Sequence, residues 1–65
     1  MQVTINGEAR DVDAATLAEL CDALGFGDAR VATAVNGDFV SRTQRAERQL
    51  QADDRIEIVA PRQGG

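Results

Sequence analysis

The chain has 65 residues, of which 43% are hydrophobic and 28% charged, and seven basic against eleven acidic side chains give a net charge of −4. This length fits one domain that buries only about 60% of its unfolded surface, so we expect a small fold of modest stability. The negative charge argues against a nucleic-acid binder, which needs clustered positive charge. The sequence shows neither a signal-peptide pattern nor an apolar run of membrane-span length. We therefore expect a cytoplasmic protein that binds no nucleic acid and no membrane.

The residue types needed for most side-chain catalysis are scarce. Histidine is absent and Cys21 is the one cysteine. An internal disulfide, the usual zinc ligand sets and the Ser-His-Asp and Cys-His nucleophile arrangements are thereby excluded. The sequence predicts a protein that is not an enzyme, holds no metal or cofactor, and depends on a partner for any chemistry.

The first twelve residues predict a β-hairpin. Polar and apolar side chains alternate over residues 2–5, with Val3 and Ile5 on one face. Asn6-Gly7 is the dipeptide preferred in a type I′ turn, because both central residues need positive φ. We expect the return strand over residues 9–12.

An amphipathic helix of about two and a half turns is predicted next. Thr16 and Glu19 have the spacing of a capping box, and four apolar residues at i, i+3, i+4 and i+7 form one stripe, namely Leu17, Leu20, Cys21 and Leu24. Gly25 is a typical residue after a helix end. Since Cys21 belongs to the stripe and its neighbours are acidic or apolar, we interpret it as a small buried hydrophobic residue rather than a reactive thiol.

A second pair of strands is predicted over residues 31–40. Residues 31–35 are apolar enough on both faces for a central strand, and the sequence leaves open which face points inward. Asn36-Gly37 predicts a second turn before a short strand at Phe39-Val40.

Residues 41–50 are polar and rich in arginine, which predicts a loop with one helical turn and Leu50 as its apolar anchor. Arg42, Arg45 and Arg48 form a basic cluster in an acidic protein. Two interpretations stay open for this cluster, a solvated loop and a contact with a docking partner.

The last predicted strand covers residues 55–60, follows a turn at Asp53-Asp54, and points Ile56 and Ile58 inward. Pro61 ends it, because proline lacks the N–H that a ladder needs. Pairing of this strand beside the first one must be parallel, through the helical crossover. The predicted fold class is therefore α+β, a ubiquitin-like β-grasp with a mixed sheet of four to five strands and one main helix on one face. Residues 1–60 form this domain, and residues 61–65 are expected to be a flexible C-terminal tail.

Over essentially its full length, the chain resembles the ThiS family of sulfur carrier proteins in thiamin biosynthesis. The resemblance is carried by Val3 to Gly7, by Thr16-Leu17 and Leu20, by "VATAVNGDFVSR" at 31–42, and by "DRIEIVAPRQGG" at 54–65. Two loops depart from the family pattern. Members often have Pro-Arg and then Trp where this chain has Ser41-Arg42 and Arg45, and Asp-Gly-Asp where it has Ala52-Asp53-Asp54.

The resemblance implies a function at the C-terminus. The carboxylate of Gly65, preceded by Gly64, would be adenylated by a ThiF-like enzyme that uses ATP. It would then become a thiocarboxylate with sulfur relayed by a protein such as a cysteine desulfurase, and donate this sulfur to thiazole synthase (ThiG-like). Pro61, Arg62 and Gln63 would contact these partners.

Other functions also fit the residues. A MoaD-like small subunit of molybdopterin synthase, or a carrier for cysteine or methionine synthesis, would use the same terminal chemistry, although MoaD-like chains are usually longer. A ubiquitin-like module that only binds, or a protein modifier, would share the fold.

Overall fold

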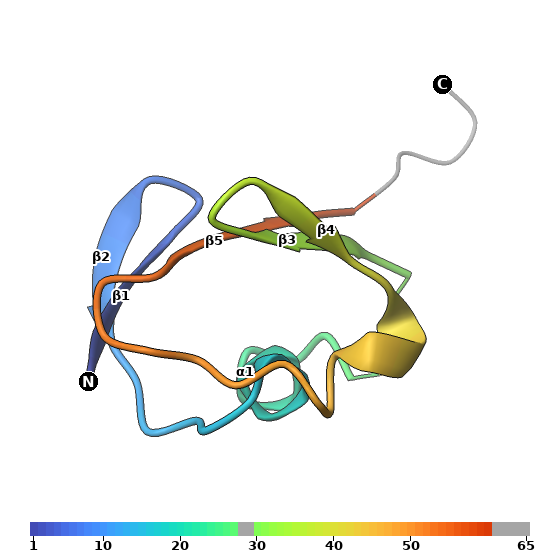
Figure 1. The fold of residues 1–65 in the computed structure, drawn as a ribbon, viewed down its shortest axis with the longest axis horizontal. Coiled ribbons are helices and arrows are strands. Elements are labelled where there is room, and N and C mark those ends of the chain that lie inside the picture. Colours follow the sequence, from blue (N-terminus) through green and yellow to red (C-terminus); the bar gives the residue numbers. More distant parts are fainter. Residues whose placement is uncertain (28–29, 61–65) are drawn as a thin grey trace.

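The computed structural model describes residues 1–27 and 30–60. Within them lie five strands, one α-helix and one short 3-10 helix (Figure 1). In chain order these are β1 (Gln2–Ile5), β2 (Glu8–Asp11), α1 (Leu17–Ala23), β3 (Ala32–Val35), β4 (Asp38–Val40), η1 (Arg42–Gln44) and β5 (Arg55–Val59).

The five strands form one mixed sheet in the order β2-β1-β5-β3-β4. The last of the described strands, β5, lies in the middle. It pairs in parallel with β1 in the register Ile5↔Ile56, and antiparallel with β3 in the register Thr33↔Ile58. The parallel pairing and the single helical crossover confirm the predicted β-grasp fold. The predicted tail, residues 61–65, lies outside the described residues.

Both predicted Asn-Gly turns are confirmed. Asn6 and Gly7 have φ of 51° and 86°, and Asn36 and Gly37 have φ of 53° and 87°. Positive φ at both central residues gives the turn a twist that matches the strands it joins. The return strand of the first hairpin is Glu8–Asp11, one residue earlier than predicted, because the turn has only two residues.

The helix begins at the predicted cap. Thr16 has extended backbone, and its Oγ1 accepts a hydrogen bond from the Glu19 N–H at 3.2 Å. The Glu19 side chain reaches back to the Ala15 N–H at 3.0 Å, one residue before the cap, instead of to Thr16 itself. Gly25, with φ of 88°, follows the helix end as expected.

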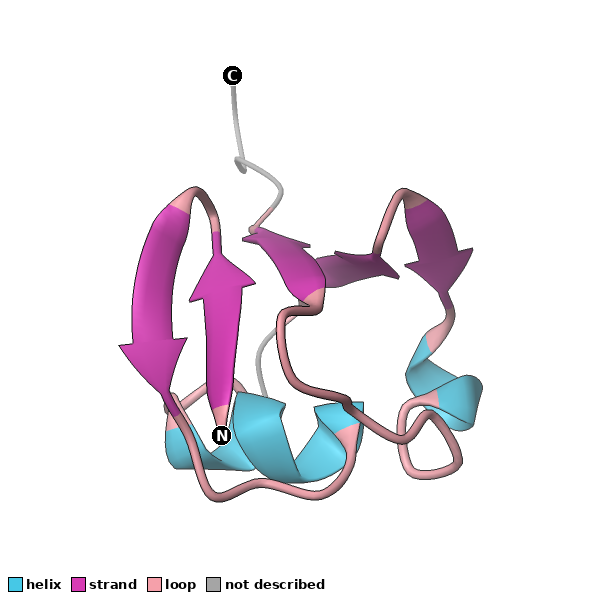
Figure 2. Cartoon of the chain, turned by 60° about the vertical axis from the view of Figure 1, so that its left-hand side comes forward, coloured by secondary structure: helices cyan, strands magenta, loops and turns pink. Residues whose placement is uncertain are grey.

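The core lies between α1 and one face of the sheet, and Figure 2 shows the helix lying across that face. The strands supply alternate residues, and Leu50 of the long loop closes the core as predicted. The face that the sequence left open is settled, because Thr33 and Val35 of β3 point inward and are at most 1% exposed. The buried apolar residues are Val3, Ile5, Leu17, Leu20, Cys21, Val35, Val40, Leu50, Ile56 and Ile58.

One residue of the arginine cluster, Arg45, differs from both interpretations of the cluster. Arg42 is exposed and Arg48 half-buried, but Arg45 is only 8% exposed. Its Nε donates to Thr33 Oγ1 at 3.0 Å and its Nη2 donates to the Val31 carbonyl at 2.6 Å. Neither the solvated-loop nor the partner-contact interpretation therefore holds for Arg45, which belongs to the interior of the fold.

Candidate functional site

The residues predicted to carry the chemistry, Gly65 and Gly64, and the predicted partner contacts Pro61, Arg62 and Gln63 lie outside the described residues. The structure does describe the strand that leads to them. β5 ends at Val59, and Ala60 is exposed. The part of the candidate site that the structure describes is therefore the end of β5 and the residues around it.

The turn residue Asn6 holds β5 on its β1 side. Its backbone N–H donates to the Ile56 carbonyl at 2.9 Å. Its carboxamide then makes two more hydrogen bonds to β5, since Oδ1 accepts from the Ile58 N–H at 2.9 Å and Nδ2 donates to the Ile58 carbonyl at 3.0 Å. In a regular parallel ladder the backbone carbonyl of residue 6 would accept from Ile58. The turn takes that carbonyl out of the ladder, and the side chain replaces it.

Asn36 repeats this arrangement on the β3 side. Its N–H donates to the Arg55 carbonyl at 2.7 Å, and its Oδ1 accepts from the Arg55 N–H at 2.9 Å. Its Nδ2 donates to the Asp54 carboxylate at 3.0 Å. Asn36 therefore fixes the start of β5, whereas Asn6 fixes its end.

The outer face of the sheet, opposite the helix, is apolar near the end of β5. Phe39 is 71% exposed and Val59 is 59% exposed, because their neighbours Val40 and Ile58 point into the core. Between them on β3 lie Ala32, which pairs with Val59, and Ala34, which pairs with Phe39. We call these four residues the apolar outer face, and the exposed Glu57 of β5, which pairs with Ala34, borders it. The predicted inward orientation of Ile56 and Ile58 places Val59 on the outer face. No sequence pattern predicted that Phe39 is exposed.

Cys21 lies on the opposite side of the sheet and is 3% exposed, which confirms it as a buried core residue. Burial raises the pKa of its thiol, Asp22 adds to the increase, and Arg45 opposes it. A protonated, covered thiol is a poor nucleophile. Cys21 is therefore unsuited to receive or pass on sulfur.

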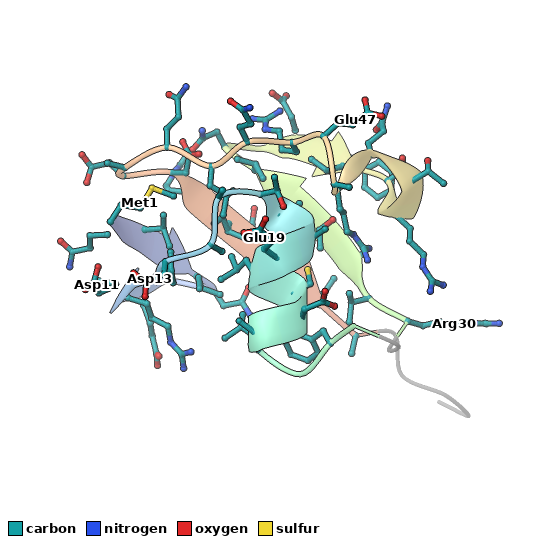
Figure 3. The ribbon with its side chains drawn as sticks, turned by 90° about the horizontal axis from the view of Figure 1, so that it is seen from below. Met1, Asp11, Asp13, Glu19, Arg30 and Glu47 are labelled. Atoms are coloured by element: carbon teal, nitrogen blue, oxygen red, sulfur yellow. The ribbon has the colours of Figure 1, made fainter. Side chains whose placement is uncertain are left out.

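A groove with several charged residues lies away from the candidate site. It has a volume of about 490 Å³, lies between α1 and the segment before it, and is lined by Arg10, Asp11, Asp13 and Glu19 along with apolar side chains. Figure 3 shows Asp11 and Asp13 toward the β2 edge and Glu19 on the helix. Across residues 1–27 and 30–60, no three His, Cys, Asp or Glu side chains are grouped to hold a metal ion.

No helix in the described part of the chain is long and apolar enough to cross a membrane.

Comparisons with known proteins place the fold and the family. The crystal structure of the thiamine biosynthesis protein ThiS from Geobacter metallireducens is similar with a TM-score of 0.82 and 29% identity, and the match covers 100% of both chains. A solution structure of a thiamine biosynthesis protein from the same organism has a TM-score of 0.80 and 28% identity, covering 100% of this chain and 88% of that one. No curated protein matched. The model of the ThiS family matches residues 3–65, nearly the whole sequence, and the chain therefore belongs to the ThiS family.

Proposed function

We propose that this protein is a sulfur carrier of thiamin biosynthesis, and that the carboxylate of Gly65 is the group that carries the sulfur. One observation carries the proposal. The family match reaches residue 65 and so includes the Gly64-Gly65 pair, which follows the central strand β5 after four residues of sequence. The two similar structures, both of thiamine biosynthesis proteins, favour this pathway over molybdopterin, cysteine or methionine synthesis.

The chemistry requires activation of the terminal carboxylate. A C-terminal carboxyl group has a pKa of about 3.3–3.7 and is ionised at neutral pH. A carboxylate is a poor target for a sulfur nucleophile. Transfer of AMP from ATP, with release of pyrophosphate, makes the carbonyl electrophilic and provides a good leaving group. Attack by sulfur then expels AMP and leaves a thiocarboxylate.

This chain would be a protein co-substrate, and three partners would act on it in turn. A ThiF-like adenylyltransferase would bind the ATP, a protein such as a cysteine desulfurase would supply the sulfur, and a ThiG-like thiazole synthase would receive it. We place these steps in the cytoplasm. The five residues 61–65 span at most about 16–18 Å when extended, which is enough to enter a buried site while the domain docks outside. Glycine at 64 and 65 adds no Cβ that would clash in a narrow channel.

The apolar outer face supports docking of a large partner beside the C-terminus. Phe39 and Val59 expose apolar surface to water, and covering this surface with a partner would be favourable. Val59 is six residues from Gly65, so a protein bound to this face has the reacting group within reach of its own active site. The adenylyltransferase is the occupant we assign to it, since activation is the first step.

The test is adenylation and sulfur transfer with the purified partners. With the ThiF-like enzyme and ATP, we expect pyrophosphate release and an acyl-adenylate on Gly65. With the sulfur source added, intact mass spectrometry should show one oxygen replaced by sulfur. The matched control is the same protein without Gly65, which should do neither. An unchanged mass in the full chain, or full sulfur transfer to the shortened chain, would reject the proposal.

A second experiment separates the carrier pathways. The protein in its thiocarboxylate form should support thiazole formation by the ThiG-like synthase. It should not restore activity to the large subunit of molybdopterin synthase. The reverse result would keep the carrier chemistry and reassign the pathway.

A further inference from the structure

The end of β5 is held unequally on its two sides. On the β3 side, backbone pairing extends to Val59, which pairs with Ala32. On the β1 side, strand pairing stops at Ile56. In the described residues, the hydrogen bonds that continue this side come from the Asn6 carboxamide.

The contacts of Asn6 fix both polar groups of one peptide residue. The Ile58 N–H and carbonyl are both bonded to the same rigid, planar amide, at 2.9 and 3.0 Å. These bonds are partly buried, so water cannot fully replace the hydrogen bonds of the Ile58 N–H and carbonyl when the amide is removed. Without the carboxamide, the last two residues of β5 would be held from the β3 side alone, and we expect them to fray.

Fraying here would affect the C-terminal reaction through geometry. In the proposed complex the apolar outer face sets where the domain docks, and Ile58 sets where the following residues start. A partner that binds the face at one place and the C-terminus at another needs a fixed relation between the two. Such preorganisation lowers the entropic cost of reaching the reactive geometry.

We propose that Asn6 is a positioning residue for the reaction of the C-terminal carboxylate. Its carboxamide fixes the end of β5 relative to the docking face, and so directs the terminal residues into the partner's active site. This inference rests on the proposed function. Asn6 touches no reacting atom, and its effect passes through the Ile58 backbone.

Three variants test the inference. Asn6→Gly keeps the positive φ of the turn but removes the carboxamide. Asn6→Asp keeps an acceptor for the Ile58 N–H and puts an oxygen, without a hydrogen, opposite the Ile58 carbonyl. Asn36→Gly is the matched control, since it removes the equivalent side-chain bonds at the start of β5.

Two measurements are made on each protein at a temperature where all are folded. Amide hydrogen exchange at Ile58 reports the hydrogen bond between its N–H and the Asn6 carboxamide. Steady-state adenylation by the ThiF-like enzyme gives kcat and KM. For Asn6→Gly we expect faster exchange at Ile58 and a kcat about tenfold lower, because the orientation of the C-terminus is lost. KM should change by about twofold or less, because three of the four residues of the apolar outer face, Ala32, Ala34 and Phe39, lie on β3 and β4, outside the end of β5 that frays. Asn6→Asp should lie between the wild type and Asn6→Gly. Asn36→Gly should keep the wild-type kcat.

The outcomes distinguish this inference from the proposed function. Wild-type kcat in Asn6→Gly, unchanged exchange at Ile58, or an equal fall of kcat in Asn36→Gly would each overturn the positioning role while leaving the carrier function in place. A wild-type protein that is not adenylated would overturn the carrier function and this inference with it.

Discussion

The guanidinium of Arg45 donates from Nε to Thr33 Oγ1 at 3.0 Å, in the interior of the protein. Thr33 in turn links Arg45 to β4, since its hydroxyl donates to the Val40 carbonyl at 2.7 Å. The backbone of the same loop segment also reaches the helix, because the Ala18 N–H donates to the Arg45 carbonyl at 3.1 Å. Arg45 therefore joins the long loop, two strands and the first turn of α1.

Replacement of Arg45 should destabilise the fold. Arg45→Met keeps the aliphatic stem but leaves the Val31 carbonyl and Thr33 Oγ1 without a donor, which should cost about 2 kcal/mol in the free energy of unfolding. Urea denaturation followed by circular dichroism measures this. Arg42→Met is the control, and because Arg42 is exposed its effect should stay within about 0.5 kcal/mol. An Arg45→Met variant as stable as the wild type would show that desolvation of the guanidinium cancels its hydrogen bonds.

Alkaline pH should destabilise the protein through Cys21. Burial raises the pKa of this thiol in the folded state above its ordinary value. The unfolded chain thus releases its proton first, so the stability is fully present well below the ordinary thiol pKa of about 8.5 and falls as the pH rises through it, by at most about 1.36 kcal/mol per pH unit.

Among the side chains Cys21 titrates alone in this range, because the chain has no lysine, tyrosine or histidine, and the Cys21→Ala variant separates its effect from that of the α-amino group, which pairs with Asp11. Urea unfolding at a series of pH values from 7 to 11 should show the decline in the wild type. Cys21→Ala should lower the free energy of unfolding at every pH, because the smaller side chain fills the core less well. It should also remove the decline with pH. A decline of equal slope in Cys21→Ala would assign the pH dependence to another group.

The helix cap should contribute measurably. Thr16→Ala removes the acceptor for the Glu19 N–H and should cost about 1 kcal/mol, which for a domain of this size lowers Tm by about 4–8 °C. Thr16→Ser keeps the hydroxyl and should retain most of the stability. Thermal unfolding by circular dichroism compares the three proteins, and an equal Tm for Ala and Ser at this position would contradict a capping role.

The apolar outer face should affect partner binding more than stability. Phe39→Thr removes the exposed ring, keeps a residue that favours strands, and should change the free energy of unfolding by about 0.5 kcal/mol or less. In adenylation assays we expect KM to rise about tenfold with kcat unchanged, as for a lost docking contact. A lower kcat at constant KM would place the effect at the reaction step and speak against docking on this face.

The elements predicted correctly are those with local signals. The two Asn-Gly pairs indicate turns with positive φ, and the Thr16–Glu19 spacing indicates the start of a helix. The alternation around Ile56 indicates a strand with one buried face. Each of these requirements acts within a few residues, so the sequence shows it directly.

The elements not predicted depend on contacts between distant residues. Arg45 lies in a polar segment that looks solvated, and its acceptors come from β3 and the residue before it, twelve to fourteen residues earlier. The Asn6 carboxamide meets Ile58 across 52 residues of sequence. The composition of a loop does not show which strand will lie beside it, so these contacts became visible only in the assembled sheet.

The central position of β5 has a consequence for folding during synthesis. The two hairpins lie on opposite sides of β5 and do not pair with each other. They are synthesised first, and the strand that joins them is the last of the five to be made. A chain interrupted before residue 55 therefore cannot assemble the sheet. A cell that removes unfolded chains would in this way keep only copies whose synthesis has passed β5, and so has come within a few residues of the carboxylate proposed to react.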